Sequence, residues 1–298
     1  MGSGMGQEIS KGPAFRLALE KPYLMHAING VAADHLCHLL PQAQHPVQHC
    51  QSQLASVYHW QRAFELVREE LSTRVTRDNM DALMSSIMLI GVHQFMLAGT
   101  TPDPSKSFIY APVHQREDGL NWLQINRGFT AMQAALGTSM RESVWFPVLV
   151  DSDIKEQSAK IMNPEAGDDT HALFIDFCEV TPASSPKNNA YYDALQCLLF
   201  LRMLKPSINN FNKLITFIGV IENEFLRLLI ERERRALLIL AHWLGLMSEL
   251  KQWWHSSRCK SECLAITTFL MHDPDERVRM LLRYPARTVG IVLTHAEE

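Results

Sequence analysis

The chain has 298 residues, 47% of them hydrophobic, and a formal net charge of −4. This composition excludes disordered, collagen-like and mucin-like chains, and the small negative charge excludes strong DNA binding by this chain alone. With only 14 glycines and 14 prolines, a protein built from many turns is disfavoured. We therefore expect an all-α fold, a single irregular domain of many helices and long loops over residues 13–298.

Neither a signal peptide nor a membrane-spanning helix is expected in this sequence. Met1–Met5 reads MGSGM, which is typical of a cloning remnant, and residues 1–12 are expected to form a flexible start. The longest apolar run, Ala236–Met247, is too short for a membrane span of about 18 residues or more. The six cysteines are scattered along the chain, and we expect reduced thiols in an intracellular compartment.

Apolar periodicity predicts the elements of the first half of the chain. Asp78 or Asn79 is expected to cap the helix over 80–97, which is apolar almost all round and so belongs in the centre of a domain. In chain order we expect two helices within 13–40 broken at Lys21-Pro22, a loop over 45–50, an amphipathic helix over 53–73, a helix over 80–97, a loop over 99–117 and a helix over 120–140.

The second half begins with the least regular segment, residues 147–189, in which a short helix is expected at the apolar run Leu173–Val180. That segment is only a weak candidate for a domain boundary. Closely spaced helices are then predicted over 191–204, 208–233, 234–254 and 256–271, followed by a stop at Asp273-Pro274 and a short tail. No repeat of 20–50 residues is present, which argues against a solenoid.

The motifs of common enzymes are missing from this sequence. It contains no phosphate-binding glycine loop of either common kind and no nucleophile elbow. Asp168-Asp169 lacks a further acidic residue on the next helical turn, so solvated loop acids are the better interpretation than a magnesium site. We expect a binding module more than an enzyme, with no catalytic residue assigned.

Two clusters of histidine and cysteine contain residue types that can bind a metal ion. His255, Cys259 and Cys263 fall on one helical face, but three ligands on two turns need a bend and a fourth ligand to hold zinc. A metal site at the first loop would require that loop to fold back on its helix, and it would use His35, Cys37, His38, His45, His49 and Cys50. We expect no metal and no cofactor in this chain.

Four phrases, in this order, resemble the C-terminal regulatory region of fungal zinc binuclear cluster transcription factors. The phrases are EKPYLMHAINGVAADHL at 20–36, HWQRAFELVREEL at 59–71 with NMDALMSSIML at 79–89, WLQINRGFTAM at 122–132, and ALLILAHWLGLMSELKQWWHSSRCKSECLAITTFL at 236–270 with the ending LRYPA at 282–286. The branch that they resemble most is that of the sterol uptake control proteins, and the likeness extends from about Phe15 to Ala286.

The resemblance implies a domain that senses an effector and dimerises, and that controls transcription by RNA polymerase II in the nucleus, with shuttling to the cytoplasm. Family members carry six closely spaced cysteines that bind two zinc ions and contact DNA, whereas no two cysteines here have the C-x2-C spacing. Zinc and DNA are therefore expected only through an N-terminal region that this chain does not contain. After Trp253-Trp254 the chain has His255-Ser256-Ser257-Arg258 where the family commonly has a glycine-containing turn.

The expected partners are a hydrophobic small molecule, sterol-like or otherwise, and a second copy of the chain. The ligand would occupy an apolar pocket, with His242 and the tryptophan N–H groups as polar anchors. The pocket candidates are Met84, Met88, Phe95, Phe225, Leu229, His242, Trp243, Trp253 and Trp254. Two alternatives stay open: an enzyme or accessory protein of secondary metabolism that handles a lipid or isoprenoid in the same chamber, and a dimerisation domain without a ligand.

Overall fold

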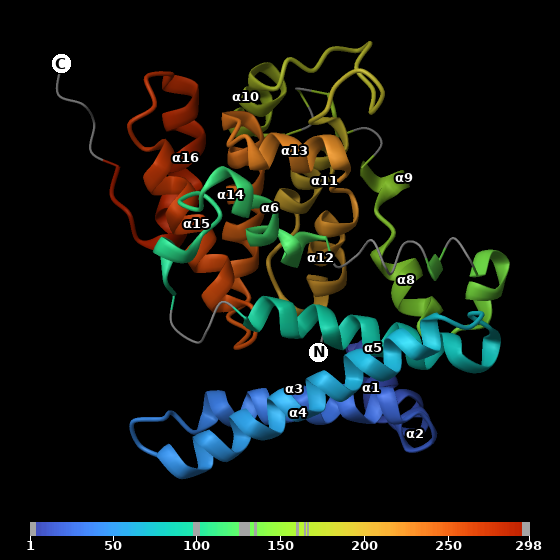
Figure 1. Ribbon diagram of the computed structural model, residues 1–298. Helices are drawn as coiled ribbons and strands as arrows, with labels where there is room; N and C mark the ends of the chain where they lie inside the picture. The colour runs from blue at the N-terminus through green and yellow to red at the C-terminus, as the bar shows by residue number, and fades with distance from the viewer. Residues whose placement is uncertain are drawn as a thin grey trace. The chain divides into compact units, whose positions relative to one another are not determined.

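The computed structural model describes residues 4–97, 102–124, 132–133, 136–158, 161–163, 165 and 167–293. These residues form helices and connecting segments without a strand, which confirms the all-α prediction (Figure 1). Contacts divide the chain into two compact units, each made of two stretches of sequence. Unit 1 contains residues 1–100 and 125–151, and unit 2 contains residues 101–124 and 152–298.

Unit 1 is built on three long helices that follow two short ones. Its elements are α1 (Gly4–Lys11), α2 (Pro13–Glu20), α3 (Pro22–Leu39), α4 (Pro46–Leu71), α5 (Arg77–Met96), the 3-10 helix η4 (Gly137–Glu142) and α8 (Phe146–Ser152), which ends at the division between units. The break at Lys21-Pro22 and the existence of a helix near 80–97 are as predicted. That helix begins at Arg77 and its cap is Thr76, not Asp78 or Asn79; the Asn79 side chain accepts from the Thr76 N–H at 2.7 Å. Residues 1–12 were expected to be flexible, but α1 occupies most of that segment.

One other prediction for unit 1 is wrong for a reason of proline chemistry, and a second is met only in part. The expected loop over 45–50 is the first turn of α4, because Pro46 stands at the first helical position, where its missing N–H has no partner to lose. Of the helix expected over 120–140, residues 132–133 and 136 are α-helical, whereas Asn121–Leu123 and Gly137–Glu142 form 3-10 helices at its two ends. Residues 125–131 and 134–135 lie outside the described part of the chain.

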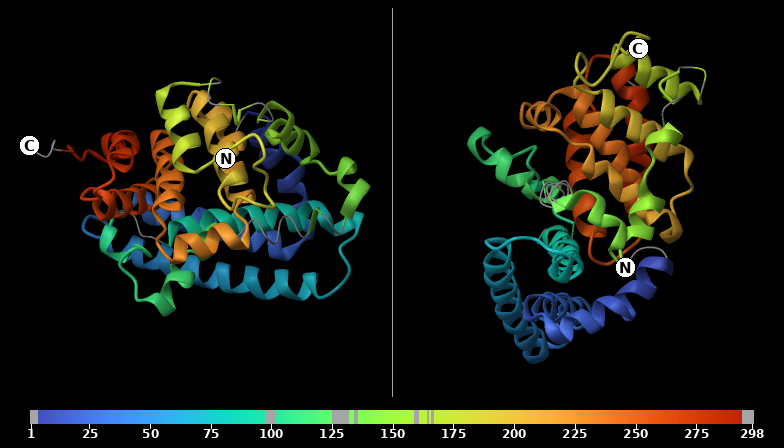
Figure 2. Two further views of the ribbon diagram at one scale, coloured as in Figure 1. Left: turned by 90° about the horizontal axis from the view of Figure 1, so that it is seen from above. Right: turned by 90° about the vertical axis from the view of Figure 1, so that its right-hand side faces the viewer.

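The helices α3 and α4 lie side by side (Figure 2). They pack closely because a glycine of α3 faces a tryptophan of α4. A Cβ added to Gly30 of α3 would lie 2.7 Å from the Trp60 ring of α4. The indole N–H of Trp60 donates to Asp34 of α3 at 2.7 Å, and Ser56 of α4 donates to the other oxygen of this carboxylate at 2.5 Å. His93 of α5 stacks on Trp60 at 4.2 Å and lies 3.3 Å from the same carboxylate, so Asp34 joins three helices.

Unit 2 surrounds the helix α14 (Arg234–Glu249), which is buried at every position from Ala236 to Ser248. Figure 1 shows α15 (Ser256–Leu270) and α16 (Glu276–Val289) packed beside it. The other elements are η1 (Pro104–Lys106), η2 (Val113–Gln115), α6 (Arg116–Gly119), η3 (Asn121–Leu123), α9 (Lys155–Ser158), α10 (Asp169–Phe177), α11 (Tyr192–Met203), η6 (Ile208–Asn210), α12 (Phe211–Gly219) and α13 (Asn223–Ile230). None of the described helices is both long and apolar enough to cross a membrane.

The structure corrects three boundaries predicted for unit 2. The helix expected over 208–233 is two helices separated at Val220–Glu222. Residues 147–189 contain α8, α9 and α10 and so hold more helix than expected. The short helix expected at 173–180 is α10, which begins four residues earlier and ends at Phe177. The expected tail is helix α16, which begins because the Asp275 side chain accepts a hydrogen bond from the Arg277 N–H at 2.9 Å.

We expect Gly30→Ala to destabilise the protein by about 1–3 kcal/mol, because the added methyl group overpacks the contact with Trp60. In an ordinary helix, replacing glycine by alanine raises the free energy of unfolding by about 1 kcal/mol. A decrease in Gly30→Ala would therefore indicate the close contact with Trp60. Urea unfolding of Gly30→Ala and of the neighbouring control Asn29→Ala measures the difference. Equal or greater stability of Gly30→Ala would contradict the close approach.

Candidate ligand-binding site

The helix α14 positions the two central pocket candidates, His242 and Trp243. Its start is fixed by Glu233, whose carboxylate accepts hydrogen bonds from the N–H groups of Arg235 at 2.8 Å and Ala236 at 3.0 Å. These two donors have no partner within the helix, so the acceptor satisfies them. From that start, the helix runs through the core of unit 2 with its apolar side chains packed on all sides.

Trp243 is packed among aromatic rings. It is fully buried, with its ring stacked on Phe217 at 5.0 Å and on Trp122 at 6.3 Å. Its indole N–H donates to the carbonyl oxygen of Leu214 at 2.8 Å. This N–H group therefore already has a partner in the protein. Trp243 holds α12 and η3 against α14.

His242 is fully buried between the rings of Phe174, at 4.8 Å, and Tyr284, at 5.3 Å. Its Nε2 lies 2.6 Å from the carbonyl oxygen of Leu281 in α16. Since a carbonyl oxygen can only accept, Nε2 carries the proton and donates it. Burial, with a smaller effect of Arg202, lowers the pKa of His242 to about 3, so the ring is neutral near pH 7.

The second ring nitrogen of His242 is left as an acceptor. In a neutral imidazole whose Nε2 carries hydrogen, Nδ1 has a free lone pair. No hydrogen-bond partner reaches this buried atom among the described residues. Buried polar atoms have a hydrogen-bond partner in the large majority of cases. Among the nine predicted pocket residues, the Nδ1 of His242 is therefore the atom at which a ligand donor would be most expected.

The other candidates are divided between the two units. Trp254, 7% exposed, lies in a turn before α15 with edge-to-face contacts to Phe211 at 5.8 Å and His255 at 4.7 Å. Trp253 is half-buried beside it, and Phe225 and Leu229 are buried on α13. Met84, Met88 and Phe95 lie on α5 in unit 1, where Met84 and Phe95 are buried and Met88 half-buried. The nine residues thus do not gather within one unit.

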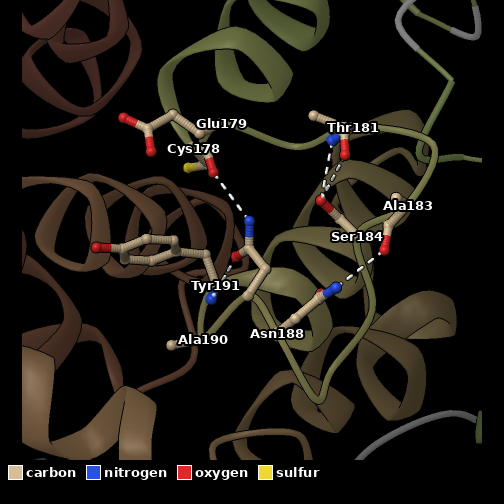
Figure 3. Close-up of a pocket in the computed structure, with 9 residues that line it drawn as sticks. Cys178, Glu179, Thr181, Ala183, Ser184, Asn188, Ala190 and Tyr191 are labelled. Carbon is tan, nitrogen blue, oxygen red and sulfur yellow. Dashed lines mark hydrogen bonds between the residues drawn. The ribbon is translucent and has the colours of Figure 1, made fainter.

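Two adjoining hollows of unit 2 lie elsewhere, along the segment between α10 and α11, and Figure 3 shows the first of them. Their volumes are about 310 and 330 Å³. Side-chain amides hold the walls together, because Asn189 donates to the Cys178 carbonyl oxygen at 3.0 Å and Asn188 donates to that of Ala183 at 3.0 Å. Phe225 is the pocket candidate that lines one of them.

These hollows have polar rather than apolar walls. Burial and then the Glu233 carboxylate raise the pKa of Tyr191 to about 12, so this phenol stays protonated near pH 7. In the second hollow, burial followed by the Glu222 carboxylate raises the pKa of Asp193. The walls therefore suit a small polar molecule better than an apolar one, and the sequence did not single out this segment as a site.

The clusters of metal-binding residue types do not assemble as a site. Cys259 lies 3.8 Å from His255 Nδ1, while Cys263 instead faces the backbone oxygens of Ala241 at 3.6 Å and Pro285 at 3.8 Å. At the first loop, His49 bonds to the Leu40 carbonyl oxygen at 2.8 Å. In the part of the chain that the structure describes, no three His, Cys, Asp or Glu side chains gather closely enough to hold a metal ion.

A buried carboxyl group that the sequence analysis did not identify lies on α15. Glu262, 2% exposed, accepts a hydrogen bond from the Ser107 hydroxyl at 2.5 Å and lies 3.7 Å from the Arg258 guanidinium. Burial raises the pKa of Glu262 to about 7, against the opposing effects of Ser107 and Arg258. In the sequence, burial of Glu262 is indicated only by its position next to Cys263 and one turn before Ile266, which places it on the buried face of α15.

Comparisons with known proteins identify no relative. No family model matches the chain, and neither a curated protein nor a solved structure matches it.

We expect Glu262 to make the protein less stable as the pH rises from about 4.5 to above 7. The folded state binds this proton more tightly than the unfolded state, so the stabilisation is complete below the unfolded pKa and is lost as the pH passes the folded pKa, by up to about 3 kcal/mol. Urea unfolding at pH 5 and pH 8 should show this slope in the wild type and not in Glu262→Gln. The exposed control Glu117→Gln should keep the wild-type slope, and a slope unchanged in Glu262→Gln would contradict the assignment.

Proposed function

We propose that this chain is the regulatory domain of a fungal transcription factor, related to the sterol uptake control branch, that acts in the nucleus on transcription by RNA polymerase II. Its effector is an apolar molecule that carries a hydroxyl group, of the sterol class. The chain also associates with a second copy, and DNA recognition belongs to a cysteine-rich region outside it.

The observation that carries this proposal is the buried acceptor of His242. The Nδ1 atom has no partner, and its surroundings are the rings of Phe174 and Tyr284. An effector hydroxyl that donates to Nδ1 would satisfy it, while aromatic faces suit the flat, apolar body of a sterol. Apolar burial at roughly 25 cal/mol per Å² would supply most of the affinity.

The positions of three of the four phrases support the same proposal. The first phrase falls on α3, the second on α4 and α5, and the fourth on α14 and α15, whereas most of the third lies outside the described residues. The fourth phrase supplies the most buried helix of unit 2 together with the turn that holds Trp253 and Trp254. These three phrases coincide with helices that form the cores.

The mechanism that follows is a shift between two arrangements of the C-terminal helices. Because His242 is fully enclosed, the effector would bind the arrangement in which α16, with Tyr284, has moved away from α14. The Tyr284 hydroxyl donates to Glu249 at 2.7 Å, and this bond holds the closed arrangement. An effector that prefers the open arrangement changes the exposure of α16 and thereby the contacts of the transcription factor.

We expect His242→Gln to separate ligand binding from stability. A glutamine N–H can replace Nε2 and keep the bond to Leu281, but it places no acceptor at the position of Nδ1. Affinity for a fluorescent sterol should fall about tenfold with unfolding free energy nearly unchanged, whereas His242→Leu should also lose about 1–3 kcal/mol of stability. Ligand titration and urea unfolding of the two variants measure both effects. Unchanged sterol affinity in His242→Gln would remove Nδ1 as the anchor.

A transcription reporter in fungal cells tests the proposed function as a whole. The chain is fused to a DNA-binding domain from another protein, and the reporter carries sites for that domain. We expect reporter expression to change several-fold when sterol is withdrawn or supplied, and this change to be lost in His242→Gln at equal protein abundance. A reporter that ignores sterol supply in both fusions would contradict the proposal.

A further inference from the structure

The outer face of α4 has a regular apolar pattern that no part of unit 1 covers. Eight positions spaced alternately three and four residues apart are all exposed, and we call them the outer seam: Val47, Cys50, Leu54, Val57, Gln61, Phe64, Arg68 and Leu71. Leu54 and Val57 are each 66% exposed and Val47 is 64% exposed. The opposite face of α4, which includes Trp60 and Ala63, is the one buried in unit 1.

A three and four spacing of apolar residues is the pattern of a coiled-coil contact between two helices. On an isolated surface helix it serves no purpose, because each exposed leucine or valine forgoes the free energy of burial. One such residue is ordinary on a protein surface, whereas a contiguous row marks an interaction site. The outer seam therefore points to a second helix as its partner.

The charges around the outer seam restrict the nature of that partner. From His35 to Gln61 the chain contains no Asp, Glu, Lys or Arg. This stretch also exposes Leu36 and Leu39 at the end of α3. The cores of protein interfaces are depleted in charged residues, so a partner with an equally uncharged, apolar helix face fits best.

We propose that two copies of this chain associate through antiparallel contact of their α4 helices, with the two-fold axis between Leu54 and Val57. A two-fold contact is self-complementary, so each residue of the seam must meet a suitable residue of the same seam. Under this axis the contacts are Val47 with Phe64, Cys50 with Gln61 and Leu54 with Val57, each occurring twice. Every contact pairs apolar or uncharged side chains.

The antiparallel direction follows from the charge at the end of the seam. Parallel helices in register would place Arg68 against Arg68 of the other copy, and like charges in contact are destabilising. In the antiparallel contact, Arg68 falls beyond Pro46, where α4 of the other copy begins. The overlap from Val47 to Phe64 is about 26 Å long at 1.5 Å per residue. An interface of this length is at the small end of specific interfaces, so we expect a concentration-dependent dimer.

A disulfide tests the register directly. In Gln61→Cys, the new thiol should meet Cys50 of the other copy, and oxidised glutathione should produce a covalent dimer whose linkage is mapped by peptide mass spectrometry. Within one helix these two positions are about 16 Å apart along the axis, beyond the reach of a disulfide. The control Gln48→Cys changes another exposed glutamine of α4, one that lies off the seam. Equal cross-linking of the two variants would overturn the register.

A charge substitution tests the surface without oxidation. Leu54→Glu places two carboxylates next to the two-fold axis and should weaken the dimer more than tenfold in sedimentation equilibrium. The control Val113→Glu changes a side chain of similar exposure, 68%, in unit 2 and should leave the dimer unchanged. Circular dichroism confirms the helix content of both variants.

Two results would overturn the proposal: a wild-type chain that stays monomeric at about 100 µM, well above a micromolar dissociation constant, or a Leu54→Glu dimer as tight as that of Val113→Glu. The proposal rests on the self-association included in the proposed function, and it depends on α4 and not on an effector. Failure of the sterol reporter therefore leaves it standing, whereas failure of the dimer contradicts the self-association and leaves the reporter test unaffected.

Discussion

The hydrogen bond between His242 and the Leu281 carbonyl oxygen connects the two helices on which the core of unit 2 depends. Pro285 lies inside α16 and has no N–H to offer to the carbonyl oxygen four residues earlier, that of Leu281. His242 supplies the donor instead, at 2.6 Å. A proline that would weaken an isolated helix thereby creates an acceptor for the one histidine in the otherwise apolar centre of α14.

The neighbourhood of Pro285 shows how polar atoms are kept in this core without charge. Its own carbonyl oxygen accepts from the Thr288 hydroxyl at 2.7 Å and lies 3.8 Å from the Cys263 thiol of α15. The contacts of α14, α15 and α16 therefore combine apolar packing with hydrogen bonds that have specific partners. A neutral His242 suits this setting, because a buried charge without a counter-ion would be costly. The same neutrality leaves one ring nitrogen as an acceptor, and the proposed function depends on that atom.

Local pattern predicted the helices whose ends are marked by local chemistry. The break at Pro22 follows from proline chemistry, and the helix α5 and the starts of α14 and α15 follow from apolar periodicity. Helix α16 was missed because Asp273-Pro274 and Pro285 both indicate an interruption, and only the packing of Val278, Leu281 and Leu282 against the other helices offsets the lost bond. Sequence could identify α16 as amphipathic but could not weigh that burial against the proline.

The candidate site was predictable to a smaller extent. The apolar pattern of α14 identifies His242 and Trp243 as buried, but their partners, Leu281 and Leu214, come from other helices and follow no spacing rule. Met84, Met88 and Phe95 were grouped with them on apolar character alone, and the structure places them in unit 1. Glu262 was overlooked because a glutamate is ordinarily exposed, and its partner Ser107 is 155 residues away in the sequence.

The segment 102–124 reaches its place in unit 2 through contacts with residues far along the chain. Ser107 bonds to Glu262, Arg116 donates to the Ile230 carbonyl oxygen at 3.1 Å, and Arg232 donates to that of Ile109 at 3.2 Å. A ribosome adds roughly 5–20 residues per second, so this segment waits on the order of 10 seconds for its partners during synthesis. Phe108, Ile109 and Trp122, all buried in the finished fold, are without these partners for that time. The nascent chain thus presents an apolar segment of the kind that chaperones bind, well before α13 and α15 exist to cover it.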